Sequence, residues 1–128
     1  SVEEGRLILA LVKEANKKNM GIIGMKVFSQ GFGCHPQAAT TSHQLVTYAL
    51  SQPISTIIVG IDTIAQLEDC VSIARAFQPM SKEDMAEIER KSKPHKKRNC
   101  FFRSEYGGYE SGEKLTPPYT LDNYDIKK

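Results

Sequence analysis

The pattern of apolar and polar positions divides the first 93 residues into alternating helices and strands. Residues 6–19 place their apolar side chains on one helical face and lysines in the last turn, which predicts an amphipathic helix. The apolar run 22–28 leads into a Ser-Gln-Gly turn, as is typical of a buried strand that enters a glycine loop. Apolar residues recur at helical spacing over 45–50 and stop before Pro53, so a second helix is expected there.

The next segment repeats this plan. Residues 54–60 are rich in β-branched side chains and end in glycine, which predicts a second buried strand. Thr63 and Gln66 have the spacing of a capping box and predict the start of a helix, and Ser81 with Asp84 predicts another. The expected order is α-β-α-β-α-α. Strands that alternate with helices favour parallel pairing through right-handed crossovers, so the fold class is α/β. The expected apolar stripe of the third helix is Ile64, Leu67, Val71, Ala74 and Phe77.

The composition changes after residue 93. The segment 94–128 begins with a basic run and continues with scattered tyrosines between glycines and prolines, which predicts an irregular tail following a body of residues 1–93. Basic and aromatic residues together also suggest nucleic-acid contacts, but no ribonucleoprotein motif or glycine-arginine repeat accompanies them. A solvated tail whose aromatic side chains pack back on the body is therefore favoured, and nucleic acid is not expected as a partner.

Composition excludes several other classes. Of the 128 residues, 40% are hydrophobic and 25% are charged, and 17 basic against 15 acidic residues leave a net charge of only +2, so no global field attracts nucleic acid or anionic membranes. The longest apolar stretch, 7–12, is far shorter than the roughly 20 residues of a membrane helix. A cytoplasmic protein is therefore expected. Cys34, Cys70 and Cys100 are odd in number and far apart, which favours neither a disulfide framework nor a zinc site.

Two stretches carry a resemblance to a known family. The stretch 13–31 contains EANKKNMGIIGMKVFSQG, and the stretch 48–77 reads YALSQPISTIIVGIDTIAQLEDCVSIARAF. In order and spacing they resemble the C-terminal part of an aldo/keto reductase, and the resemblance covers roughly residues 6–92. It implies a partial (β/α)8 TIM-type barrel that contains the last two parallel strands with their helices. A complete barrel is excluded, because such barrels usually need about 250 residues.

The expected site lies where the two strands end. In barrels, ligands bind at the carboxyl ends of the strands, and the turns 29–31 and 60–63 follow those ends. The second turn leads into a helix N-terminus, whose N–H groups and dipole favour an anion. In the resembled family this anion is the adenosine 2′-phosphate of NADPH. The resemblance implies cofactor contacts for Met25, Lys26, Phe28, Ser29, Gly31, Gly60, Ile61, Asp62, Thr63, Gln66 and Asp69.

Several of these positions depart from the family pattern. Met25 stands where an aromatic residue commonly stacks on the nicotinamide, and Lys26 stands where a hydroxyl residue commonly meets the pyrophosphate. Gln66 stands where many members place an arginine, and it lacks the bidentate, charge-assisted bonds that arginine forms with phosphate. Asp62 adds a carboxylate beside the expected anion, so these residues do not fix a preference for NADP over NAD. Helix capping alone explains Asp62 and Thr63, and a lysine that extends from a strand end to solvent explains Lys26.

Catalytic residues are not expected in this chain. Members of the family reduce carbonyl substrates with a tyrosine proton donor that comes from the first half of the barrel, and no residue here matches that half. Tyr48 is expected to pack within a helix, and His43 is expected at a surface or capping position. The sequence therefore predicts a fragment of an aldo/keto reductase, an NAD(P)H-dependent oxidoreductase, that binds the nicotinamide cofactor and is inactive alone. A stand-alone nucleotide-binding or protein-interaction module is the alternative.

The short predicted sheet also implies a need for partners. Two parallel strands leave unpaired backbone groups on both outer edges and apolar side chains that a closed barrel buries. We therefore expect self-association or pairing with a complementary N-terminal barrel half.

Overall fold

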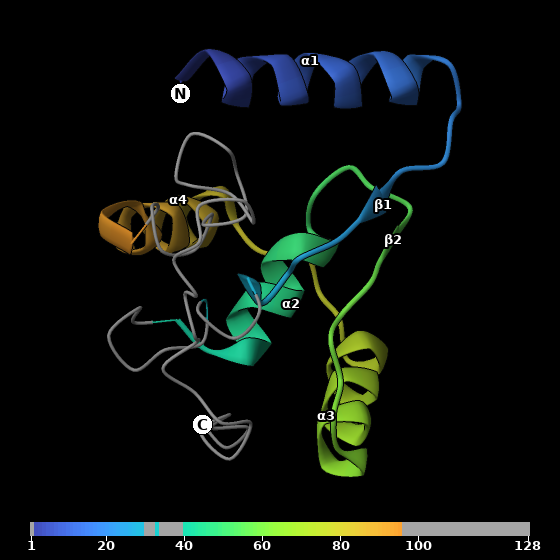
Figure 1. Ribbon diagram of the computed structural model, residues 1–128, viewed down its shortest axis with the longest axis vertical. Coiled ribbons are helices and arrows are strands. Elements are labelled where there is room, and N and C mark those ends of the chain that lie inside the picture. The colour runs from blue at the N-terminus through green and yellow to red at the C-terminus, as the bar shows by residue number, and fades with distance from the viewer. Residues whose placement is uncertain (1, 30–32, 34–39, 96–128) are drawn as a thin grey trace, which may run out of the picture.

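A computed structural model describes residues 2–29, 33 and 40–95 of the chain (Figure 1). This part of the chain is an α/β structure with four α-helices and a two-stranded parallel sheet. The predicted order of helices and strands is confirmed. The elements are α1 (Val2–Lys17), β1 (Ile23–Gly24), α2 (Ser42–Leu50), β2 (Thr56–Ile57), α3 (Ile64–Arg75), α4 (Lys82–Ser92) and a 3-10 helix, η3 (Lys93–His95). The boundary expected between residues 93 and 94 thus lies inside η3, and the remainder of the predicted tail lies outside the described residues.

The two strands pair in parallel, as predicted, but they are much shorter than predicted. Ile23 pairs with Thr56 and Gly24 with Ile57, and the Ile58 N–H donates to the Gly24 carbonyl at 2.8 Å. The expectation of strands over 22–28 and 54–60 is therefore wrong in extent. The first strand ends because the backbone turns: Lys26 and Ser29 have φ values of 61° and 50°, which an extended strand does not adopt.

The helices begin where their capping residues predict. Thr63 and Gln66 form the predicted capping box of α3, and the Ser81 hydroxyl accepts a hydrogen bond from the Asp84 N–H at the start of α4. Helix α1 begins earlier than expected and ends two residues earlier. Its end is a Schellman motif, in which Asn19 has a φ of 54° and the Met20 N–H donates to the Ala15 carbonyl. Asparagine tolerates this left-handed conformation better than most residues do, so the helix ends there.

The hydrophobic core is small and lies between α2, α3 and the turn after β1. Phe28, Val46 and Ile73 are buried together, and Ile88 of α4 is also buried. Partly buried side chains pack around the first three: Val27, Leu45, Leu50, Ile57, Val59 and Cys70. The inward positions expected for Met85 and Ile88 are confirmed, since Met85 is half-buried and Ile88 is buried.

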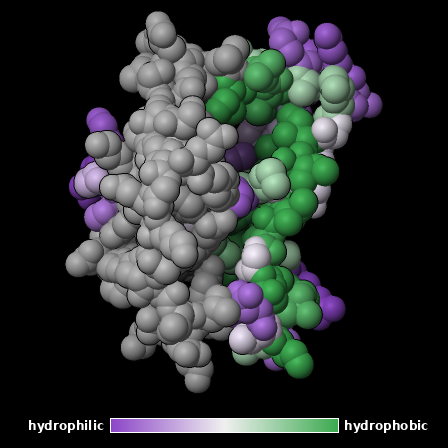
Figure 2. All heavy atoms as spheres, in the orientation of Figure 1, coloured by the Kyte–Doolittle hydropathy of each residue, from purple (hydrophilic) through white to green (hydrophobic). Residues whose placement is uncertain are grey.

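Many large apolar side chains remain exposed, contrary to the expectation of two buried strands and buried helix stripes. Ile23 is 62% exposed and Ile64 is 76% exposed. Figure 2 shows apolar side chains gathered along one side of the molecule, over the strands and α3. We call the following residues the exposed apolar set: Ile23, Met25, Ile58, Ile61, Ile64, Leu67 and Val71. Helix α1, which lies apart from the other helices in Figure 1, adds Ile8, Leu9 and Leu11.

The reason for this difference is that periodicity identifies the apolar face of an element but does not show whether anything covers it. In α3 the predicted stripe is wrong, because Gln66, Cys70 and Ile73 face the core. The side chains of Ile64, Leu67, Val71 and Ala74 are exposed instead. Within the described part of the chain, nothing encloses the apolar face of α1.

Candidate functional site

The parallel register brings the two predicted site segments to one edge of the sheet. β1 and β2 run in the same direction with Gly24 opposite Ile57, so the segments that follow the two strands leave the sheet at the same end. Met25 follows Gly24 and is 66% exposed, and Lys26 is exposed beyond it. The second segment continues from Ile58 toward the start of α3. The two segments therefore leave neighbouring positions at the carboxyl end of the sheet, as the site prediction requires.

The turn after β1 is fixed by its backbone. The Ser29 N–H donates to the Lys26 carbonyl at 2.9 Å, and the Gly33 N–H donates to the Phe28 carbonyl at 3.1 Å. Ser29 is half-buried. Phe28 is only 5% exposed and belongs to the core cluster. Its side chain therefore packs in the core and is not accessible to a ligand. Gly31, which was predicted to contact the cofactor, lies outside the described residues.

The turn before α3 closes on itself through Gln66. The side-chain oxygen of Gln66, Oε1, accepts hydrogen bonds from the Asp62 N–H at 2.8 Å and from the Thr63 N–H at 3.3 Å. The Gln66 N–H in turn donates to the Thr63 hydroxyl at 3.2 Å. Gln66 is 6% exposed. Three of the backbone donors that the sequence analysis assigned to an anion are therefore already paired within the protein.

The remaining donors of this helix end are few. Among the first N–H groups of α3, those of Ile64 and Ala65 precede the first intrahelical hydrogen bond, which joins the Leu67 N–H to the Thr63 carbonyl. Gly60 and Ile61, both exposed, lie before the turn. Of the five N–H groups of residues 62–66, three are paired within the protein. Two backbone N–H groups, those of Ile64 and Ala65, could therefore donate to a further hydrogen-bond acceptor.

The charge around this turn is negative. Asp62 and Glu68 are exposed and Asp69 is half-buried, and the sequence contains no lysine or arginine between Lys26 and Arg75. Arg75 lies nine residues beyond Gln66 on α3, which is about 13 Å along the helix axis. The start of α3 therefore combines carboxylates with a helix dipole and has no cationic side chain of its own.

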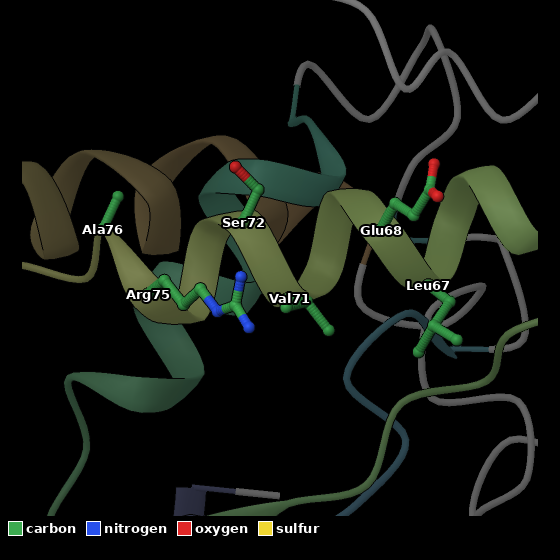
Figure 3. Close-up of a pocket in the computed structure, with 6 residues that line it drawn as sticks. All are labelled: Leu67, Glu68, Val71, Ser72, Arg75 and Ala76. Atoms are coloured by element: carbon green, nitrogen blue, oxygen red, sulfur yellow. The ribbon is translucent and has the colours of Figure 1, made fainter.

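A hollow of about 590 Å³ follows the surface of α3. Figure 3 shows its lining, with Leu67 and Val71 pointing to one side of the helix and Glu68 and Ser72 to the other. Arg75 and Ala76 complete the lining at the C-terminal end. Since Leu67 and Val71 belong to the exposed apolar set, this surface suits an apolar partner better than a charged ligand.

Three further side chains have structural roles. The Tyr48 hydroxyl donates to Glu89 Oε1 at 2.8 Å and so joins α2 to α4. The half-buried side chain and this hydrogen bond confirm the packing role. Burial, followed by the Glu89 carboxylate, raises the pKa of Tyr48 above its ordinary value and makes the phenol a poorer acid. His43 is exposed on α2, as expected. Burial, followed by the charge of Asp69, raises the pKa of Cys70 and disfavours its reactive thiolate.

The sequence analysis assigned Gln66 both to a capping box and to the phosphate side of a cofactor site. The capping box, predicted from the Thr-x-x-Gln spacing, is confirmed. The cofactor contact stays a prediction. A second such box, Thr41 with Gln44, caps α2 and was not predicted.

Comparisons of the chain with protein-family models, with curated proteins and with solved structures found no match. None of the helices in the described ranges combines the length and apolar character needed to span a bilayer.

Proposed function

We propose that the chain is the C-terminal part of an aldo/keto reductase barrel that supplies loops for a nicotinamide dinucleotide. The observation that carries this proposal is the in-register pairing of β1 and β2, which directs the segments after both strands to one edge of the sheet. The order of the elements and the residues that resemble the family support the same conclusion. NADPH is the cofactor that the resemblance implies.

In this proposal each exposed residue at the strand ends has a defined task. Met25 offers an apolar side chain to the nicotinamide ring, and Lys26 offers an ammonium group to the pyrophosphate. The segment 60–66 holds the adenosine end by backbone contacts. The bound cofactor supplies the hydride that the family transfers to carbonyl substrates.

The chain alone is not expected to complete this reaction. Reduction of a carbonyl also needs a proton donor, and the Tyr48 hydroxyl is engaged with Glu89 at a raised pKa. We expect no NADPH oxidation with simple aldehydes above that of a Lys26→Met variant. Turnover above that control contradicts the assignment of an inactive fragment.

Calorimetric titration with NADH and NADPH tests the binding proposal. We expect weak binding that Lys26→Met reduces at least threefold, because the variant removes the charge beside the pyrophosphate. Lys18→Met is the matched control, since Lys18 is exposed at the end of the α1 segment and outside the site. A folded sample that binds neither dinucleotide at millimolar concentration refutes the cofactor assignment.

The exposed apolar set supports a second proposal, that the chain functions in an assembly. In a parallel ladder the backbone groups alternate, so those of Ile23 point away from β2, and among the described residues no strand pairs with that edge. The side chains of Ile23 and Met25 on this segment are exposed, and so is that of Ile58 just after β2. We propose that a complementary N-terminal barrel half, or a second copy of this chain, covers this surface.

Sedimentation velocity at micromolar concentration tests the assembly. The isolated chain is expected to form oligomers, and Ile58→Lys is expected to shift it toward monomer because it places a charge in the apolar surface. Gln78→Lys adds the same charge at an exposed position between α3 and α4 and serves as the control. A compact wild-type monomer with a cooperative thermal transition contradicts the need for a partner and favours a stand-alone module.

A further inference from the structure

We propose that α3 pairs in antiparallel orientation with α3 of a second copy of this chain. The contact consists of the exposed apolar face of the helix and of two reciprocal ion pairs between Glu68 and Arg75. This inference rests on the assembly proposed above, for which it names the partner and the contact residues. It does not depend on the cofactor.

The outer face of α3 has the spacing of a helix that packs against another helix. It carries four exposed residues at intervals of three, four and three positions: Ile64, Leu67, Val71 and Ala74. We call these residues the α3 apolar line. The hollow in Figure 3 includes Leu67 and Val71 of this line. Alternating intervals of three and four residues are typical of helices that pair side by side.

Two opposite charges border the α3 apolar line on the same side. Glu68 lies four residues after Ile64 and Arg75 lies four residues after Val71, so both occupy the same position of the repeat, and both are exposed. They are seven residues apart, which is about 10 Å along the helix. Among the residues that the structure describes, neither forms an ion pair. This face therefore offers a partner one negative and one positive charge.

An antiparallel second copy of α3 matches both charges. With Leu67 opposite the partner's Val71, every residue of the α3 apolar line faces an apolar residue of the partner. In this register Glu68 and the partner's Arg75 are offset by about 7.5 Å along the helices. Side chains lean toward the N-terminus of their own helix, so in an antiparallel pair these two lean toward each other. The two-fold axis repeats the ion pair, as in an isologous interface.

A parallel pair does not match these charges. In a parallel pair the position of Glu68 and Arg75 faces the residues that precede the apolar line on the partner. In α3 these are Thr63 and Cys70, which carry no charge to balance either residue. The reciprocal match also requires the same surface on both partners. The observations therefore favour a second copy of this chain in antiparallel orientation.

Exchange of the two charges tests the orientation. Sedimentation velocity of the full chain covers about 5 to 200 µM, because one short helix from each copy gives a small interface and weak association. Glu68→Arg alone and Arg75→Glu alone each place like charges at both contacts, so each is expected to raise the apparent dissociation constant about fivefold. The double variant restores opposite charges and is expected to return the constant to within about twofold of wild type. Glu83→Arg makes the same change at an exposed position of α4 and is the control.

A further pair of variants tests the apolar contact. Val71→Lys places a lysine in the α3 apolar line of both copies and is expected to raise the dissociation constant about tenfold or more, since burial of an unpaired charge is unfavourable. Ala65→Lys adds the same charge at an exposed position of α3 outside the line and is expected to leave association unchanged. Circular dichroism verifies that each variant is folded.

The outcomes separate this inference from the proposals above. If Ile58→Lys weakens association and the α3 variants do not, the inference is wrong while the proposed assembly stands. If the double charge variant associates as weakly as the single variants, the antiparallel pairing is wrong. A folded wild type that stays monomeric over the whole concentration range refutes both the inference and the assembly, and the cofactor proposal is then decided by its own titration.

Discussion

Truncation of Val46 tests whether the small core is the main source of stability. Val46 is 2% exposed in α2, whereas Val71 is 40% exposed in α3. Both valines lie inside helices, so valine to alanine gives the same gain in helix propensity at either position. The pair therefore isolates burial as the variable.

The expected magnitude follows from the atoms removed. Valine to alanine deletes two methyl groups, at about 0.8 kcal/mol each for full burial, and the cavity left in a packed core adds of the order of 1 kcal/mol. We expect Val46→Ala to lower the free energy of unfolding by about 2 kcal/mol. At Val71 no enclosed cavity forms and part of the side chain already meets water, so a loss below about 1 kcal/mol is expected.

Chemical denaturation followed by circular dichroism measures both values. The two variants are compared with wild type at one protein concentration, because association also stabilises the folded state. Equal losses for Val46→Ala and Val71→Ala would refute the reasoning, and they would show that the exposed face of α3 is covered in solution. A loss at Val46 below about 0.5 kcal/mol would show that the buried cluster does not hold the helices together.

Two further predictions concern a pH effect and the packing of glycines. The pKa of Tyr48 in the folded protein is raised above its ordinary value of 10. The contribution of Tyr48 to stability is therefore complete below pH 10 and decreases as the pH rises above about 10. Denaturant unfolding should show this decrease in wild type, and an equally steep decrease in a Tyr48→Phe variant would contradict the prediction. Gly33→Ala should destabilise by about 1 to 3 kcal/mol, since a Cβ there meets Leu45 Cδ1 at 2.9 Å and the Phe28 carbonyl oxygen at 3.3 Å. Gly60→Ala, where nothing lies within 4 Å of the added Cβ, should leave the free energy of unfolding unchanged. Denaturant unfolding measures both variants, and equal losses at the two glycines would refute the steric argument.

Local chemistry made some elements predictable from the sequence. The Thr63–Gln66 and Ser81–Asp84 spacings identified two helix starts because a capping interaction involves only residues three positions apart. The strand lengths were not predictable in this way. Lys26 and Ser29 adopt left-handed backbone conformations beside Phe28, which is packed in the core, and no local pattern in the sequence indicates either feature.

The parallel pairing of the two strands was predictable, but the direction of the side chains beyond them was not. Adjacent parallel strands direct the segments that follow β1 and β2 to the same end of the sheet, as expected from the α/β order. Which atoms of Gln66 are available there depends on side-chain direction. The structure directs the carboxamide back to Asp62 and Thr63, so a residue expected to face a ligand instead completes the protein's own backbone.

The capping boxes of α2 and α3 have a consequence for the behaviour of the chain in acid. Both use a glutamine, Gln44 and Gln66, and neither helix has an acidic residue in its first turn. Their capping hydrogen bonds therefore involve no titrating group and persist when carboxylates are protonated. The start of α4 differs, because the Ser81 hydroxyl donates to the Asp84 carboxylate at 2.8 Å. The caps of α2 and α3 are thus built from neutral groups alone, whereas the start of α4 includes a carboxylate.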